Sequence, residues 1–209
     1  MTSINGDNNA LFIHVPKAAG SVMEVSPWLG GAGHRPALDV QQGMHPSRWE
    51  SFFKFAFVRN PLDRLVSAYF HFVQKPRKAG EFAEYQVCYM QIKEHHARYA
   101  SGPLEGFPEF IQQFDLEHLQ KTINHFRPQV YFVCDQQGSL LLDFLGRVET
   151  LDKDWETVCG LAGQPHLPLA RRNATVHRPW QDYYTPELRR LAVALYYYDA
   201  DVLYPELWE

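Results

Sequence analysis

The sequence predicts an α/β fold, a parallel sheet flanked by helices on both faces, in a single domain that spans residues 1–209. Two observations predict it: strand-like apolar runs alternate with segments of helical periodicity, and two of the runs end in turns that suit anions. The 209 residues contain no Ser/Gly/Pro-rich linker, and a hydrophobic content of 45% is sufficient for one substantial core. We therefore expect a ligand site at the carboxyl ends of neighbouring strands.

The first turn follows the apolar run at residues 10–13, which predicts a buried strand that ends at Pro16. Lys17 adds a positive charge, and Ser21 begins a predicted helix whose first N–H groups favour negative charge. Between them lie small residues that let a backbone approach an anion closely: Ala18, Ala19 and Gly20. The loop is shorter than a Walker loop and lacks its Lys-Ser/Thr pair, which weakens a nucleoside triphosphatase interpretation. An ordinary turn with a solvated lysine remains the alternative.

The second turn follows residues 52–58, an aromatic-rich run that predicts a mostly buried strand ending at Arg59. Asn60 is a suitable N-cap and Pro61 a favoured first helical residue, so we expect a helix to begin here. Apolar residues at helical spacing predict its core-facing stripe: Leu62, Leu65, Val66, Tyr69 and Val73.

Arg59 and Ser67 are the anion-binding candidates of this second segment. Ser67 falls on the polar face of the predicted helix, where its hydroxyl can add one donor to the paired donors of the Arg59 guanidinium. The two side chains can therefore converge on one anion. The alternative is that Arg59 pairs with Asp63 and that Ser67 is merely exposed. Together, the two turns indicate a ligand with two separate phosphate-like groups.

These residues match the motifs of a known family. Residues 14–21 resemble the 5′-phosphosulfate loop, and residues 59–67 the 3′-phosphate segment, of sulfotransferases that use 3′-phosphoadenosine 5′-phosphosulfate (PAPS). The sequence is most similar to the carbohydrate branch, with the chondroitin 4-O- and heparan sulfate 2-O-enzymes and small bacterial relatives. The similarity continues through residues 125–129 (His-Phe-Arg-Pro-Gln) and 144–151 (Phe-Leu-Gly-Arg-Val-Glu-Thr-Leu) and covers nearly the whole chain. It implies the sulfotransferase fold, with a P-loop-like parallel sheet, and PAPS as the donor.

The resemblance also implies roles for individual residues. Lys17 would contact the 5′-phosphosulfate and stabilise charge on the bridging oxygen, beside the backbone N–H groups of residues 18–21 and the Ser21 hydroxyl. Arg59 and Ser67 would hold the 3′-phosphate. A late basic segment returns to that phosphate in the family, which points to Arg171 and Arg172. The family has Thr-Gly or Thr-Ala where this chain has Ala18-Ala19, so one hydroxyl contact is missing.

Transfer to a hydroxyl needs a base, and His34 is the candidate because related enzymes place a histidine between the two phosphate motifs. The ordinary pKa of histidine suits proton transfer near neutral pH. His45, in the same stretch, is the reserve candidate. The implied activity is in-line sulfuryl transfer to an acceptor hydroxyl, and a carbohydrate is the expected acceptor.

Two other functions remain open, a nucleotide-binding protein without catalysis and a P-loop kinase. A sulfuryl group carries less negative charge than a phosphoryl group, so fixed cations suffice and no metal is expected. The cysteines Cys88, Cys134 and Cys159 are too far apart for Cys-x-x-Cys ligation, and the adjacent His95 and His96 point in different directions on a helix. We interpret them as structural or exposed.

Composition indicates which classes of partner and which cellular compartment to expect. The formal net charge of −4 disfavours a nucleic-acid-binding surface. No stretch approaches the ~20 apolar residues of a membrane span, and residues 1–9 do not resemble a signal peptide. Three sparse cysteines favour a reducing compartment, so a cytoplasmic location is expected, whereas the oligomeric state is left open.

The rest of the chain predicts a mostly helical protein. Further strands are expected at residues 130–134 and 146–149. Helices are expected at residues 81–100, 107–114, 116–126, 140–145, 152–162 and 186–198.

Overall fold

The computed structural model describes most of the chain: residues 9–23, 29, 33–75, 83–102, 104–166, 168, 169 and 175–208. Arg171 and Arg172 lie outside the described residues, and so does the side chain of Ser21. The chain divides into two compact units, each built from two stretches: unit 1 from Met1–Asn60 and Gln129–Asn173, and unit 2 from Pro61–Pro128 and Ala174–Glu209. The single domain expected from composition stays a prediction.

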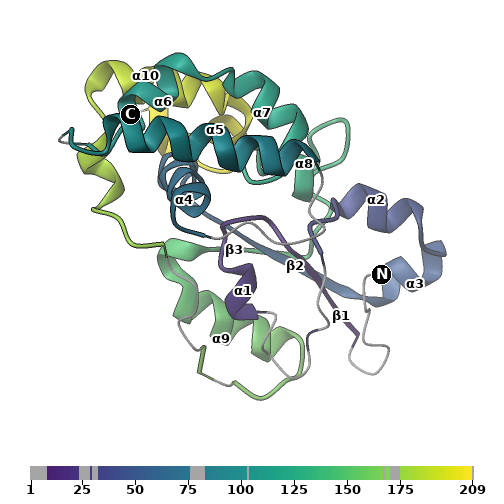
Figure 1. The fold of residues 1–209 in the computed structure, drawn as a ribbon. Coiled ribbons are helices and arrows are strands. Elements are labelled where there is room, and N and C mark those ends of the chain that lie inside the picture. Colours follow the sequence, from purple (N-terminus) through teal and green to yellow (C-terminus); the bar gives the residue numbers. More distant parts are fainter. Residues whose placement is uncertain are drawn as a thin grey trace. The chain divides into compact units, whose positions relative to one another are not determined.

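Unit 1 contains a three-stranded parallel sheet in the order β1-β2-β3 (Figure 1). Its strands are β1 Ala10–Ile13, β2 Phe53–Val58 and β3 Phe144–Arg147. In the register, Ala10 lies opposite Phe53, and Val58 lies opposite Arg147. The predicted parallel sheet is confirmed, and so are the strands predicted at residues 10–13 and 52–58. The strand predicted at residues 146–149 is observed as β3, which begins at Phe144 and ends at Arg147. The P-loop-like character that the family resemblance implies for this sheet stays a prediction.

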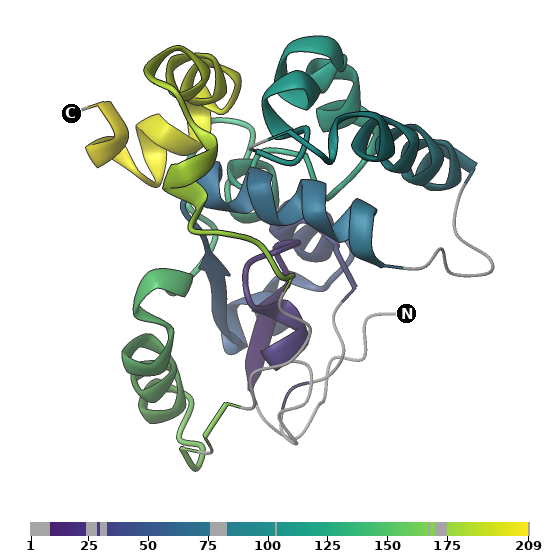
Figure 2. The same ribbon diagram turned by 60° about the vertical axis from the view of Figure 1, so that its left-hand side comes forward.

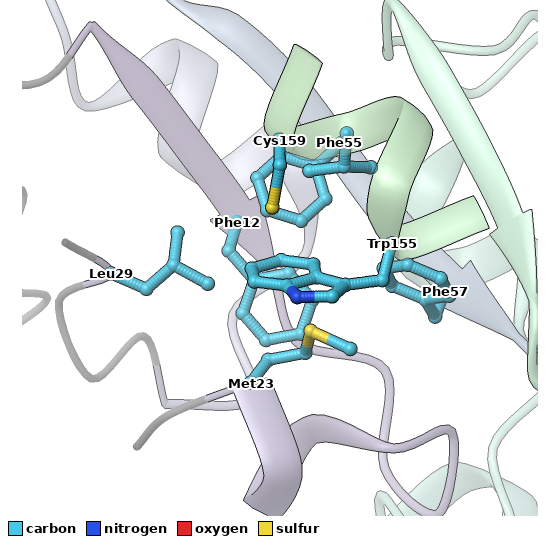
Figure 3. Close-up of a cluster of buried hydrophobic side chains, with 8 residues drawn as sticks. Phe12, Met23, Leu29, Phe55, Phe57, Trp155 and Cys159 are labelled. Carbon is cyan, nitrogen blue, oxygen red and sulfur yellow. The ribbon is translucent and has the colours of Figure 1, made fainter. Parts of the chain in front are cut away.

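One face of this sheet packs against two helices of unit 1, α1 Gly20–Met23 and α9 Leu151–Leu161. Trp155 of α9 is fully buried among aromatic side chains of β1 and β2 (Figure 3). The cluster consists of Phe12, Met23, Leu29, Phe55, Phe57, Trp155, Val158 and Cys159. Ala56 and Val58, which alternate with the aromatic residues of β2, are also fully buried. Both faces of the central strand are therefore covered, which explains its nearly continuous apolar sequence.

Four more short elements complete the described part of unit 1: α2 Ala37–Gln42, α3 Pro46–Ser51, α8 Val130–Val133 and the 3₁₀ turn η1 Val148–Thr150. The strand predicted at residues 130–134 is wrong, because residues 130–133 form α8. A short apolar run does not by itself distinguish a strand from a buried helical turn.

The helix predicted at residues 140–145 is also wrong. Leu140 instead forms an antiparallel bridge with Cys134, and Phe144 already belongs to β3. The intervening turn is stabilised by Asp135, whose Oδ1 accepts hydrogen bonds from the backbone N–H groups of Gln137 and Ser139. An Asp side chain that bonds to its own turn favours a reversal of the chain over a helix.

In its described residues, unit 2 is helical (Figure 2, with α4 in blue). Its elements are α4 Pro61–Gln74, α5 Ala83–Tyr99, α6 Phe107–Gln113, α7 Leu116–Thr122, η2 Trp180–Tyr183, α10 Pro186–Leu195, α11 Tyr197–Val202 and η3 Pro205–Trp208. The predicted start of α4 at Pro61 is confirmed. The helix expected at residues 186–198 divides at Tyr196 into α10 and α11.

Helix α4 is the centre of unit 2 and packs against α5, η2 and α10. Its buried residues cover most of its circumference and include Ser67, which was expected on the polar face. The other residues expected on that face, Asp63, His71 and Gln74, are half-buried or exposed. Arg64 and Ser67 are only 1% and 2% exposed. The Arg64 guanidinium donates to the backbone oxygen of Asn124 at 3.3 Å, which compensates part of the cost of its burial.

Candidate functional site

The turn after β1 has an unusual backbone. Lys17 and Ala19 both adopt positive φ angles, 68° and 61°, although neither is glycine. Each costs about 1–2 kcal/mol relative to the right-handed conformation, so the surrounding structure must impose them. The backbone N–H of Ala18 donates to Val15 O at 3.2 Å and closes the turn. The predicted anion loop is therefore a constrained turn, and such constraint is typical of functional sites.

Gly20 has a second reason to lack a side chain, beside the backbone access for an anion that the sequence predicts. A Cβ atom at this position would lie 1.7 Å from Nε2 of His14, so the imidazole occupies the space that a side chain would need. The described part of helix α1 begins at Gly20.

His34 lies against His14, with the two ring centroids 4.2 Å apart in an edge-on arrangement. Its Nδ1 is 3.4 Å from the backbone oxygen of His14. Because a carbonyl oxygen only accepts, a hydrogen bond here requires a hydrogen on Nδ1, and Nε2 is the basic nitrogen of a neutral ring in that tautomer. The predicted base thus contacts the residue that directly follows β1.

Arg59 reaches the same turn from the end of β2. Its Nη1 lies 3.5 Å from the backbone oxygen of Lys17, a long hydrogen bond. The contact is possible because β1 and β2 are parallel neighbours whose carboxyl ends share one edge of the sheet. The structure therefore brings together two of the predicted donor-site segments, the loop of Lys17 and the strand end of Arg59.

Two residues to which the sequence assigned no role hold the backbone at Arg59. The amide of Gln129, which is fully buried, donates to Arg59 O at 2.7 Å and accepts from Arg59 N at 2.9 Å. Glu149 Oε1 accepts from the next backbone N–H, that of Asn60, at 2.6 Å. Both residues belong to the later motifs, at residues 125–129 and 144–151, and those motifs were the signal that could have found them.

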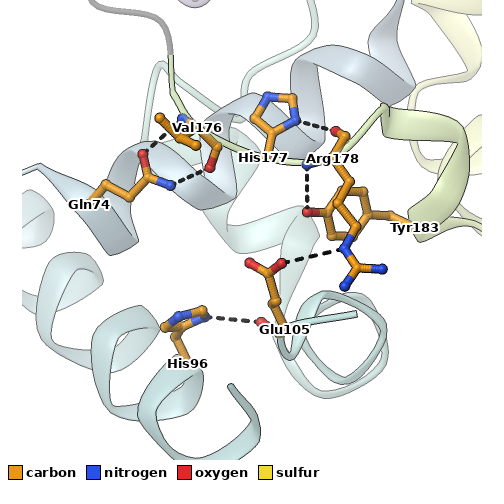
Figure 4. Close-up of polar contacts among 7 residues, drawn as sticks. All are labelled: Gln74, His96, Glu105, Val176, His177, Arg178 and Tyr183. Atoms are coloured by element: carbon orange, nitrogen blue, oxygen red, sulfur yellow. Dashed lines mark hydrogen bonds and ion pairs between the residues drawn. The ribbon is translucent and has the colours of Figure 1, made fainter. Parts of the chain in front are cut away.

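Ser67 belongs to unit 2 and lies beside the late segment of the chain. Its Oγ is 3.2 Å from Oγ1 of Thr175. About two turns further along α4, the amide of Gln74 pairs with both backbone polar groups of Val176 (Figure 4). Thr175 and Val176 thus contact α4, whereas Arg171 and Arg172 lie outside the described residues. Because Arg59 and Ser67 fall in different units, their convergence on one phosphate stays a prediction.

The reserve base, His45, occupies the N-cap position of α3, and its Nδ1 lies 2.8 Å from Ser47 Oγ. His95 and His96 each contact a backbone oxygen, of Gly106 at 2.9 Å and of Glu105 at 3.0 Å, as expected for structural residues. Within the described ranges, no group of three or more His, Cys, Asp or Glu residues could hold a metal ion. No helix in the described part of the chain is both long and apolar enough to span a bilayer.

Comparison with known proteins identifies the family. The model of the sulfotransferase family matches residues 32–205, which include Arg59, Ser67 and the later motifs. The chain belongs to the sulfotransferase family. The matched range begins after the loop of Lys17, so the role of that loop depends on the geometry described above.

The curated relatives are carbohydrate sulfotransferases. The chain is 32% identical over 188 residues to carbohydrate sulfotransferase 14 of Homo sapiens. This alignment covers 78% of the chain and 47% of the relative. Against carbohydrate sulfotransferase 14 of Mus musculus it is 35% identical over 151 residues, or 68% of the chain and 38% of the relative. Carbohydrate sulfotransferase 12 of Mus musculus is 28% identical over 151 residues, 65% of the chain and 35% of the relative. The matches span about half or less of these relatives. No solved structure matches the chain.

Proposed function

We propose that the protein transfers a sulfuryl group from PAPS to a hydroxyl group of a carbohydrate acceptor. The observation that carries the proposal is the meeting, in a chain of the sulfotransferase family, of the Lys17 turn with the Arg59 guanidinium. The names of the relatives support a carbohydrate acceptor.

The residues of unit 1 fit an anionic nucleotide donor. Lys17 and Arg59 supply two positive charges at one edge of the sheet, and a guanidinium can offer two parallel donors to a phosphate. Under this proposal, Lys17 contacts the 5′-phosphosulfate together with the backbone of residues 18–21. Arg59 and Ser67 contact the 3′-phosphate, and Arg171 and Arg172 belong to the same end of the donor.

The proposed reaction is a direct displacement. The acceptor oxygen forms a bond to sulfur while the bond between sulfur and the bridging oxygen of the donor breaks, which releases 3′-phosphoadenosine 5′-phosphate (PAP). The hydroxyl proton passes to Nε2 of His34, the nitrogen that the contact with His14 O leaves basic. Lys17 stabilises the charge that develops on the leaving bridging oxygen. These groups supply charge stabilisation and proton transfer without a metal ion.

A thermal-shift comparison of PAP, ATP with Mg²⁺, and NAD tests the donor. A ligand at about 100 times its dissociation constant adds ~2.7 kcal/mol of stability, and we expect that effect for PAP alone. Incubation with sulfur-labelled PAPS and a panel of glycans then tests transfer. Transfer from ATP without any response to PAP would instead support a kinase. PAP binding without transfer, unchanged in His34→Ala, would support a binding protein without catalysis.

A further inference from the structure

We infer that Gln129 is a positioning residue for the donor site, because its side-chain amide fixes the backbone of Arg59 and thereby aims the guanidinium. The inference rests on the proposed function, in which Arg59 contacts the donor. It gives a role to residues 125–129, which the proposed reaction does not otherwise use.

Arg59 lies just beyond the paired strands of the sheet. Strand β2 ends at Val58, whose partner Arg147 is the last residue of β3. Arg59 is therefore the first residue beyond the paired strands, and its backbone N–H and C=O need other partners. Gln129 provides both: its Oε1 accepts from Arg59 N at 2.9 Å, and its Nε2 donates to Arg59 O at 2.7 Å. The amide thus takes the place of a backbone partner on a neighbouring strand.

The Gln129 amide donates and accepts at the same time without any change of protonation. The Oε1 atom accepts while Nε2 donates, whereas an ionised carboxylate would only accept and a methionine would do neither. The Gln129 side chain has no exposed surface, so water cannot replace the lost bonds without a rearrangement. Gln129 itself precedes α8, whose Phe132 and Val133 are fully buried and fix it in unit 1.

The neighbouring residue is held in the same way. The Glu149 carboxylate accepts from Asn60 N at 2.6 Å, a charge-assisted bond from the segment that follows β3. The backbone of two consecutive residues, just beyond the end of β2, is thus held by two distant stretches of the chain. The guanidinium of Arg59 then extends from a fixed backbone toward Lys17 O.

Calorimetric titration of Gln129→Met with PAP tests the inference. Methionine keeps the length of the side chain and removes both hydrogen bonds. We expect the dissociation constant to rise about 10- to 100-fold, as for the loss of buried hydrogen-bond partners, while kcat at saturating donor falls much less. The matched control is Gln120→Met in unit 2, which removes an amide bond to Leu195 O (3.0 Å) and should leave PAP affinity unchanged.

Gln129→Glu adds a readout that a packing role would not change. A neutral carboxyl can donate to Arg59 O, whereas an ionised one repels it, so PAP affinity should be restored as the pH falls through the pKa of the new carboxyl. The same affinity measured in the wild type should lack this additional titration. Hydrogen exchange at the Arg59 backbone N–H should be faster in Gln129→Met than in Gln120→Met.

The outcomes separate the two proposals. If the wild type binds PAP and Gln129→Met binds it equally well, the positioning role is overturned and the proposed function stands. An equal loss of affinity in Gln120→Met, or a Gln129→Glu affinity without the added pH dependence, also overturns it. If the wild type does not bind PAP, the proposed function fails and the positioning role fails with it, since Arg59 then has no donor to meet.

Discussion

Each unit fixes a segment of the proposed donor site with a glutamine, but the two glutamines differ in burial. In unit 1, Gln129 is fully buried and pairs with the backbone of Arg59. In unit 2, Gln74 is exposed and pairs with the backbone of Val176 (Figure 4). Water can replace the second pair more easily than the first. The difference indicates that the Arg59 end is built as a rigid part of the sheet, whereas the late segment is held by bonds that open at lower cost.

The largest effects should come from unit 1, which carries the proposed chemistry. Lys17→Ala and His34→Ala should each lower kcat roughly 10²–10⁴-fold, because they remove charge stabilisation and general-base help. The measurement is the rate of labelled sulfate transfer at saturating PAPS. For His34→Ala, PAP affinity should remain that of the wild type, and a normal kcat in this variant would exclude His34 as the base. His45→Ala is the matched control.

The next largest effects should be on PAP affinity, when either of the two proposed contacts to the 3′-phosphate is removed. Arg59→Ala should raise the dissociation constant of PAP roughly 10- to 150-fold, because a charge-assisted contact is lost. Ser67→Ala removes a neutral hydroxyl and should raise it only about 2- to 10-fold. Titration calorimetry measures both. Unchanged PAP affinity in Arg59→Ala would contradict the assignment of Arg59 to the 3′-phosphate. A larger loss of affinity in Ser67→Ala than in Arg59→Ala would show that the unit 2 contact contributes more than the unit 1 contact.

A third prediction concerns stability at alkaline pH. Burial raises the pKa of Cys88 from its ordinary 9.0 to about 12, and it also raises the pKa values of the Tyr69 and Tyr196 phenols. The folded unit 2 therefore keeps protons that the unfolded chain releases, so stability is full below pH 9 and is lost as the pH rises. Each group contributes a slope of about 1.4 kcal/mol per pH unit between its two pKa values.

Urea unfolding between pH 8 and 11 measures this slope. Cys88→Ala should flatten it above pH 9, whatever its effect on stability at neutral pH. Hydrogen exchange at pH 10 should show faster opening in α4 and α5 than in the sheet of unit 1, whose aromatic core consists of Phe and Trp side chains. Equal protection of the two units at this pH would contradict the comparison.

The smallest effect should follow from the exposed glutamine. Gln74→Met removes both bonds to Val176 and should lower the free energy of unfolding by about 1 kcal/mol and weaken PAP binding only a few-fold. Urea unfolding and calorimetry measure the two quantities. Gln113→Met, which removes a 3.4 Å contact with the Tyr99 hydroxyl, is the control on an exposed glutamine outside the proposed site. A loss of affinity as large as that of Gln129→Met would show that both units bind the donor equally rigidly.

Local rules predicted the elements that position the site. The aromatic run of β2 and the Asn60-Pro61 start of α4 were predicted correctly because they depend on neighbouring residues. The short run at residues 130–133 was not, because four apolar residues satisfy a strand and a helical turn equally well. The burial of Ser67 was missed because it depends on the whole circumference of α4.

The supports of the site had no local signal. Gln129 and Arg59 are separated by 70 positions in the chain, and a hydrogen bond between a side chain and a distant backbone leaves no periodic pattern. The motif at residues 125–129 marked this stretch as part of the family pattern, but it did not indicate that Gln129 bonds to the backbone of Arg59. Gly20 was predicted as the last small residue before a helix that begins at Ser21, whereas the helix begins at Gly20 itself and the His14 ring occupies the space beside it.

The contact between Gly20 and His14 makes positions 14 and 20 epistatic. A methyl group at position 20 would collide with the His14 imidazole, so alanine there is costly beside histidine and harmless beside a much smaller residue at position 14. That compensation would remove the ring against which His34 packs edge-on. A lineage that lost this glycine through such a pair of changes would therefore need another way to orient its base.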